Sequence, residues 1–106
     1  MNAGGYAAQA KTDSVAGTVR ANWIGFGPDR AFAHIYSDHQ GKKAQQAELQ
    51  LEQNGESQSF TRDFWPAEFV LPIDPKTSVK LTLTVIDDQG QRHPAPTLEL
   101  SPPAAP

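Results

Sequence analysis

Alternation of apolar and polar residues is the dominant pattern along this chain. The clearest example is the segment 79–85, where every second residue is apolar: Val79, Leu81, Leu83 and Val85. A period of two is typical of a β-strand with one buried face. Weaker versions of the same pattern predict strands at residues 14–23, 31–37 and 97–100.

Residues 44–53 are open to two interpretations. Their composition of Ala, Gln, Glu and Leu suits a helix. However, the dipeptide Asn54-Gly55 that follows is a strong signal for a two-residue β-hairpin turn. Such a hairpin places Leu49 opposite Phe60, so that two large apolar residues share one face. The pattern therefore favours a hairpin, residues 47–53 with residues 56–61, over a helix.

Prolines and turn residues divide the rest of the chain. Pro66 and Pro72 lack a backbone donor, which makes residues 67–73 an edge strand or an interrupted one. Gly90 in Asp88-Gln89-Gly90 can take the positive φ that a turn needs. About six or seven short strands predict an all-β fold, an antiparallel β-sandwich of the immunoglobulin or transthyretin type. We expect a single domain over residues 14–101, with a flexible lead-in at 1–13 and a Pro/Ala-rich tail at 102–106.

Composition narrows the possible functions. The 106 residues carry a net charge of −3, with nine Lys and Arg scattered among twelve acidic residues, which argues against nucleic-acid binding. The absence of Cys excludes disulfides, a thiolate nucleophile and a Cys-based zinc site. No apolar run is long enough to cross a membrane. Residues 1–10 lack the basic flank and apolar core of a signal peptide, and Met1 is interpreted as the start of an expressed segment.

Candidate chemistry is sparse. Asp38, His39 and His93 lie in turns and could in principle hold zinc, but they lack paired-ligand spacing, and His34 lies in the middle of a strand. No Ser has the Gly-x-Ser-x-Gly setting of a nucleophile, and the pair Asp87-Asp88 is explained by a hairpin turn. We therefore predict no catalytic residues, no metal site and no cofactor, and do not expect an enzyme.

Large aromatic residues are the remaining candidates for binding a partner. Trp23, Phe26, Phe64 and Trp65 lie near loop ends, next to glycines or prolines. They could close the ends of a small sandwich, or some of them could form an exposed apolar surface for a peptide or a sugar ring. As candidate partner-binding residues we name Trp23, Phe26, Phe64 and Trp65.

One stretch carries a family resemblance. The segment Pro66-Ala67-Glu68-Phe69-Val70-Leu71-Pro72-Ile73-Asp74-Pro75, a strand at 79–86 and the turn Asp88-Gln89-Gly90-Gln91 follow one another. In this order they resemble the outer-membrane lipoprotein family that contains the pilotin chaperones of type III secretion. The N-terminal part of the chain is compatible with the same family, with Val15-Ala16-Gly17-Thr18-Val19 as the opening strand. The resemblance covers about residues 14–100, but the family's lipid-carrying Cys is absent.

The resemblance implies a non-catalytic chaperone. It would be a periplasmic β-sandwich tethered to the outer membrane through a lipid anchor that this sequence lacks. Its partner would be the C-terminal segment of a secretin subunit, which it would help to reach the membrane and assemble. The alternative is an immunoglobulin-like accessory module, such as a carbohydrate-binding one, of a larger secreted protein.

Overall fold

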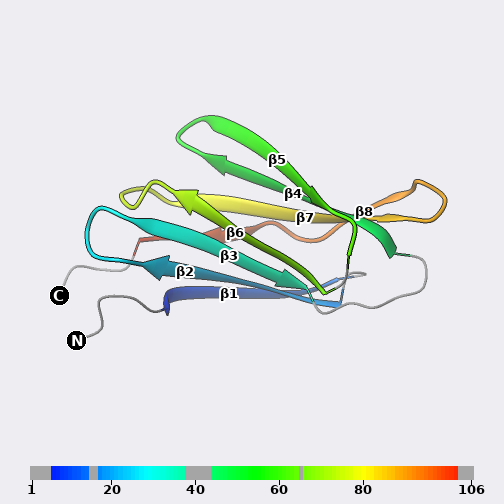
Figure 1. Cartoon of the computed structure of the whole chain (residues 1–106), viewed down its shortest axis with the longest axis horizontal. Helices are drawn as coiled ribbons and strands as arrows, with labels where there is room; N and C mark the ends of the chain where they lie inside the picture. The colour runs from blue at the N-terminus through cyan, green and yellow to red at the C-terminus, as the bar shows by residue number, and fades with distance from the viewer. Residues whose placement is uncertain (1–5, 15–16, 38–43, 65, 103–106) are drawn as a thin grey trace.

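The chain folds into two antiparallel β-sheets. The computed structural model describes residues 6–14, 17–37, 44–64 and 66–102. One sheet has the strand order β1-β2-β3-β6, and the other has the order β5-β4-β7, with β8 and β9 along the far side of β7 (Figure 1). The strands are β1 (Tyr6–Ser14), β2 (Gly17–Gly25), β3 (Ala31–Ser37), β4 (Ala44–Gln53), β5 (Glu56–Arg62), β6 (Ala67–Ile73), β7 (Val79–Asp87), β8 (Arg92–Pro94) and β9 (Leu98–Leu100).

Period-two alternation builds the core. Strands β3 and β6 bury every second residue along their whole length. Residues of both sheets contribute the largest fully buried side chains, among them Trp23, Phe69, Ile35, Leu49 and Leu81. Such alternation lets each strand bury one face and leave the other to solvent. The predicted all-β sandwich is confirmed.

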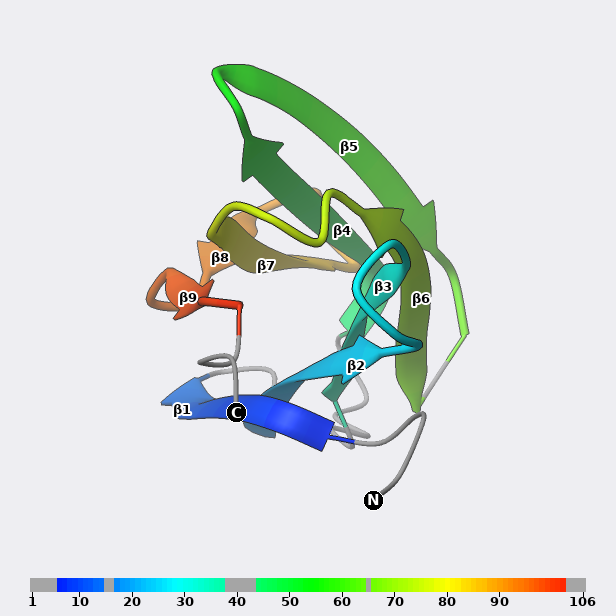
Figure 2. The ribbon, with the colours of Figure 1, turned by 90° about the vertical axis from the view of Figure 1, so that its left-hand side faces the viewer.

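Three connections between the described strands pass from one sheet to the other. The chain goes from β3 to β4, returns from β5 to β6, and passes again from β6 to β7. Strand β6 pairs with β3, and β7 pairs with β4. The consecutive strands β3 and β4 therefore lie in different sheets, and so do β6 and β7. This arrangement is a Greek-key feature of many β-sandwiches. Because of this order, β5 and β6 form free edges on the same side of the molecule (Figure 2).

The β4–β5 hairpin confirms one of the two interpretations of residues 44–53. Asn54 and Gly55 have φ values of 57° and 77°, as a type I′ turn requires. The predicted pairing of Leu49 with Phe60 is present, so the helix alternative is wrong. The tip of this hairpin is joined to the turn between β6 and β7, where Asn54 Nδ2 donates to Asp74 Oδ2 at 2.9 Å.

The N-terminal segment differs from the prediction. Residues 6–13, expected to belong to a flexible lead-in, lie in β1, which pairs with β2 in a register that sets Ala10 opposite Ala21. The alternation of Ala with Gln and Lys here was too weakly apolar to predict a strand. An edge strand is nevertheless held by main-chain pairing, which does not need large side chains. Residues 1–5 lie outside the described residues.

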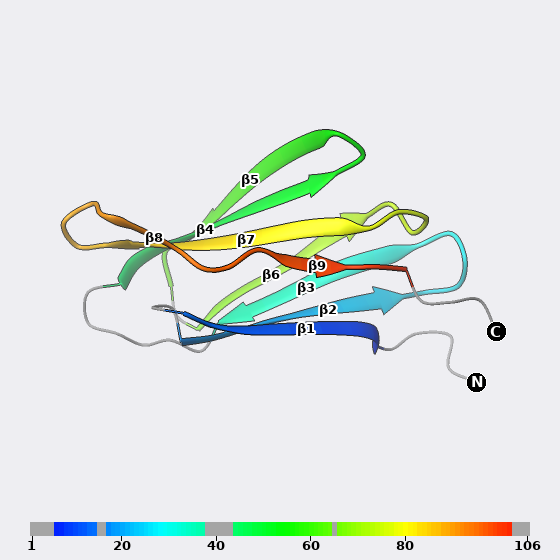
Figure 3. The same ribbon diagram turned by 180° about the vertical axis from the view of Figure 1, so that it is seen from behind.

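The C-terminal edge is one strand broken in the middle. Strand β8 and then β9 pair with successive parts of β7 (Figure 3). The predicted disruption near Pro94 and Pro96 is present as a break between the two strands at residues 95–97, although Pro94 still pairs with Thr84 and Ala95 N–H donates to the carbonyl of Leu83 at 2.8 Å. The described residues therefore contain nine strands rather than six or seven, because β1 is added and the return strand is split. In the predicted tail, residues 103–106 lie outside the described residues.

Candidate functional site

The four predicted partner-binding residues have different surroundings. Trp23 is 1% exposed at an inward-facing position of β2, so it is a core residue and cannot contact a partner. Its place in the alternation between Ala21 and Gly25 accounts for this burial. Phe26 and Phe64 are 50% and 54% exposed. Trp65 lies outside the described residues.

Phe26 and Phe64 do not form one cluster. Phe26 follows β2 at the end of the sheet where Ala31 pairs with Ile73. Phe64 precedes β6 at the other end, where Ser37 pairs with Ala67. The length of β6 separates these ends by roughly 20 Å. Only one of the two can therefore belong to any compact binding surface on this sheet.

An apolar patch surrounds Phe26 on the outer face of its sheet. We define it by the side chains of Ile24, Phe26, Phe32, Val70 and Pro72. Ile24, Phe32 and Pro72 lie opposite one another on β2, β3 and β6, so they share one face. Val70, 54% exposed, is two residues from Pro72 on the same face of β6. Val70 and Pro72 are exposed and Ile24 and Phe32 are half-buried, so apolar groups of three adjacent strands reach the surface together, as in many interaction surfaces.

Ring contacts order one end of the apolar patch. The Phe26 and Phe32 rings meet edge to face, with centroids 5.7 Å apart and an interplanar angle of 82°. The Arg30 guanidinium carbon lies 5.8 Å from the Phe32 ring centroid. The loop is closed by a hydrogen bond from Phe26 N–H to the Arg30 carbonyl at 2.9 Å. Phe26 is thus held at the surface by a defined turn, which reduces the entropy lost when a partner covers it.

A polar network borders the apolar patch. Asn22 Nδ2 lies 3.1 Å from His34 Nδ1, and His34 Nε2 lies 2.6 Å from Glu68 Oε2. If the Asn22 amide donates to Nδ1, the ring proton is on Nε2 and is donated to the Glu68 carboxylate. Both ring nitrogens are then engaged, so His34 has no free nitrogen with which to activate a nucleophile. The network orients Glu68 at the rim of the patch.

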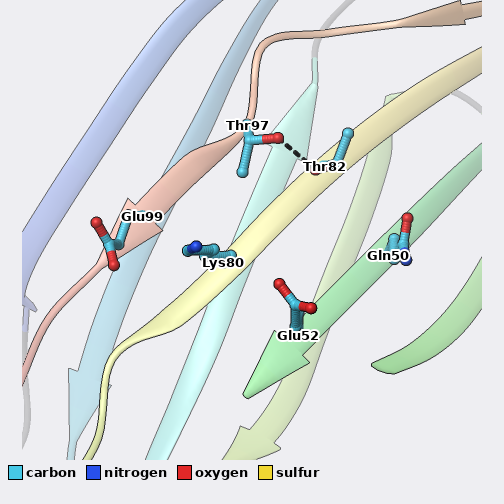
Figure 4. Close-up of a pocket in the computed structure, with 6 residues that line it drawn as sticks. All are labelled: Gln50, Glu52, Lys80, Thr82, Thr97 and Glu99. Atoms are coloured by element: carbon cyan, nitrogen blue, oxygen red, sulfur yellow. Dashed lines mark hydrogen bonds between the residues drawn. The ribbon is translucent and has the colours of Figure 1, made fainter. Parts of the chain in front are cut away.

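The outer face of the other sheet is polar. A shallow depression of about 460 Å³ lies across β4, β7 and β9 (Figure 4). Thr82 and Thr97 hydroxyls hydrogen-bond at 2.8 Å in it, and Lys80 lies opposite Glu52 and Glu99 in the strand register. Its lining is polar or charged throughout: Gln50, Glu52, Lys80, Thr82, Thr97 and Glu99. The lining of this depression offers hydrogen-bonding groups, in contrast to the apolar patch.

The candidate metal ligands have structural roles where they are described. His93 Nε2 lies 3.0 Å from Asp87 Oδ2, and Asp87 Oδ1 accepts the N–H groups of Gln89 and Gln91. These contacts lower the pKa of Asp87 below its usual value, and the contact with His93 has the largest effect. The predicted hairpin-turn role of Asp87 is confirmed. Asp38 and His39 lie outside the described residues, and within the described part of the chain no group of three or more His, Asp or Glu side chains is placed to hold a metal ion.

Sequence reasoning found Phe26 but missed Phe32, Val70 and Pro72. The signal was present, since alternation in 67–73 puts Val70 and Pro72 on the face opposite to Phe69 and Leu71. What the sequence does not contain is the pairing of β6 with β3, which brings these residues beside Phe32.

Comparisons with known proteins give no relative. Within the described residues there is no helix of the length and apolarity needed to span a membrane. No protein-family model matches the chain, no curated protein matches it, and no solved structure matches it.

Proposed function

We propose that this protein is a non-catalytic binding domain that captures an apolar segment of a partner protein on the apolar patch. The observation that carries the proposal is the contrast between the two outer faces. One has Ile24, Phe32 and Pro72 in a row across three strands, beside the exposed Val70, whereas the other is polar. An exposed sheet face normally carries polar residues, so the apolar one is the better candidate for a docking surface.

The patch has the composition of a small protein interface. Aromatic and aliphatic groups are at its centre, while Arg30 and the network ending in Glu68 are at its rim. Central apolar anchors supply most of the binding energy, and a polar rim fixes orientation. An amphipathic or extended segment could lay its apolar side chains on Phe26, Phe32 and Val70. The patch would shield these side chains from water and from aggregation.

More specifically, the proposed function is that of a pilotin, a chaperone that binds a secretin subunit. The partner is then the C-terminal segment of a secretin subunit, the site of action is the periplasm at the outer membrane, and the domain assists secretin targeting and assembly. This specific form is supported by the resemblance of the segment around β6, the strand that contributes Val70 and Pro72 to the patch. The chemistry required is binding alone.

A peptide titration tests the proposal. The C-terminal peptide of the secretin encoded in the same genome is titrated into the purified domain by calorimetry. Val70→Lys is compared with Gln50→Lys, which adds the same charge at an exposed position on the polar face. Covering the exposed half of a Val is worth about 1 kcal/mol, so Val70→Lys weakens binding by about fivefold or more. Gln50→Lys leaves the Kd unchanged.

Two results would contradict the proposal. Equal weakening by Val70→Lys and Gln50→Lys would mean that the patch is not the docking surface. Absence of peptide binding together with binding to a polysaccharide panel would favour the accessory-module alternative. In that case the polar depression around Thr82 and Thr97 would be the site, and Gln50→Lys would be the damaging variant.

A further inference from the structure

We propose that two copies of this chain associate through the free edge of β5. The β5 strand of one copy pairs antiparallel with β5 of the other about a two-fold axis at Ser59. The two sheets that contain β5 then become one continuous sheet across the dimer. This surface is separate from the apolar patch, which lies on β2, β3 and β6 and stays open to its partner.

The first support is the hydrogen-bonding state of β5. In a ladder that starts at a two-residue turn, Gln53 and Glu56 exchange hydrogen bonds, and every second pair after them does the same. The bond from Ala95 N–H to the Leu83 carbonyl agrees with this alternation. It shows that the main-chain groups of Leu83 point away from β4, so those of its partner Leu49 point toward β5. Consequently, Ser57, Ser59 and Thr61 direct their main-chain N–H and C=O groups away from β4, to the open edge.

The second support is that this edge lacks the features that block pairing. Strand β6 contains Pro72, the β8–β9 edge is interrupted by Pro94 and Pro96, and β1 has a bulge near its start. Prolines and bulges are common means of preventing edge-to-edge association. The stretch from Ser57 to Thr61 has no proline, no bulge and no charge. Its residues are also exposed or half-buried, and the contact at the Thr61 carbonyl comes from Arg62 of the same strand.

The third support is charge complementarity with a second copy. When Ser59 lies opposite Ser59 of the second copy, Ser57 lies opposite Thr61, and Glu56 opposite Arg62. The three outward-facing residues of one edge then meet those of the other, which allows about six main-chain hydrogen bonds. The same register places a carboxylate opposite a guanidinium at both ends of the ladder. Opposite charges in directly facing positions stabilise an antiparallel pair.

Arg62 is already held where this pairing needs it. Its guanidinium carbon lies 4.6 Å from the Phe69 ring centroid, and Nη1 donates to the Thr61 carbonyl at 2.8 Å. The side chain is therefore anchored beside the edge and keeps further N–H groups for the second copy's Glu56. The Thr61 carbonyl has two lone pairs, so it can accept from Arg62 and from the second copy's Ser57 together.

The experiment is analytical ultracentrifugation of the full chain over a range of concentrations. The wild type is expected to show a monomer–dimer equilibrium. Ser59→Lys places two like charges face to face at the two-fold axis and abolishes the dimer. Lys on an edge strand is well tolerated by a fold, and far-ultraviolet circular dichroism checks that the variant is folded.

A charge swap makes the test specific for the register. Glu56→Arg turns two attractive pairs into repulsive ones and weakens the dimer by about tenfold. The double variant Glu56→Arg/Arg62→Glu restores the attraction with the order reversed and returns the dimer toward wild-type strength. A wild type that stays monomeric at all concentrations overturns the proposal. So does a dimer that Ser59→Lys leaves intact, or one that the double variant fails to rescue.

Discussion

Gln53 is the side chain whose removal should most clearly loosen the β4–β5 hairpin. Its Nε2 donates to the carbonyls of Asp74 at 3.0 Å and Thr77 at 3.1 Å. Its Oε1 accepts the N–H of Asp74 at 2.9 Å. One amide thus joins the end of β4 to the turn between β6 and β7, which belong to different sheets. We predict that Gln53→Ala lowers the free energy of unfolding.

The expected loss follows from these three bonds. Each hydrogen bond contributes about 0.5–1.5 kcal/mol net, and a buried group left without a partner costs more. Because the bonds are only partly buried, water replaces some of them in the variant. We therefore expect a loss of about 1–3 kcal/mol, which for a domain of this size lowers Tm by several degrees or more.

Urea unfolding followed by circular dichroism measures the effect. Gln58→Ala is the matched control, because Gln58 is an exposed glutamine on the same hairpin. It should change the unfolding free energy by no more than about 0.5 kcal/mol. Equal losses for Gln53→Ala and Gln58→Ala would refute the role assigned to the Gln53 amide. A fall in the m-value would instead indicate that the variant no longer unfolds in a single transition.

Three further predictions concern the fold. Leu49→Ala, at a fully buried position, should cost about 2–5 kcal/mol in urea unfolding, and a cost under about 1 kcal/mol would contradict its place in the core. Gly55→Ala should lower the free energy of unfolding by about 1–2 kcal/mol because of the φ of +77° alone, since nothing lies within 4 Å of the added Cβ. An unchanged urea midpoint of unfolding would contradict the type I′ turn. The pKa of Asp87 is lowered in the folded state, and the hydrogen bond with His93 is the largest cause. The ionised carboxylate therefore stabilises the fold above the unfolded-state pKa, and this stabilisation is lost as the pH falls through the folded-state pKa. The stability deficit of Asp87→Asn at pH 7 should therefore shrink below about pH 4, and a deficit that is independent of pH would contradict the ionic role.

Much of the fold could be predicted from local pattern. The strand at residues 31–37 and the Asn54-Gly55 hairpin match β3 and the β4–β5 turn, because alternation and turn chemistry depend on near neighbours. β1 could not be predicted in this way. Its stability comes from pairing with β2, and pairing between strands leaves little trace in a weakly apolar sequence.

The candidate site was less predictable than the fold. Trp23 was named as a large aromatic residue near a loop end, where it could either close the sandwich or bind a partner, and its position in the alternation of β2 buries it. Val70 and Pro72 were visible as outward-facing residues of one strand. That they join Phe32 depends on the pairing of β6 with β3, two strands far apart in sequence. A surface built across strands is therefore hidden until the strand order is known.

The central claim is that the outer face of the β1-β2-β3-β6 sheet binds the partner. Amide chemical-shift mapping of the labelled domain during titration with the secretin C-terminal peptide tests it most directly. The largest shifts are expected at Ile24, Phe32 and Val70, on three neighbouring strands. Shifts centred instead on Lys80 and Thr82 of the polar depression would contradict it.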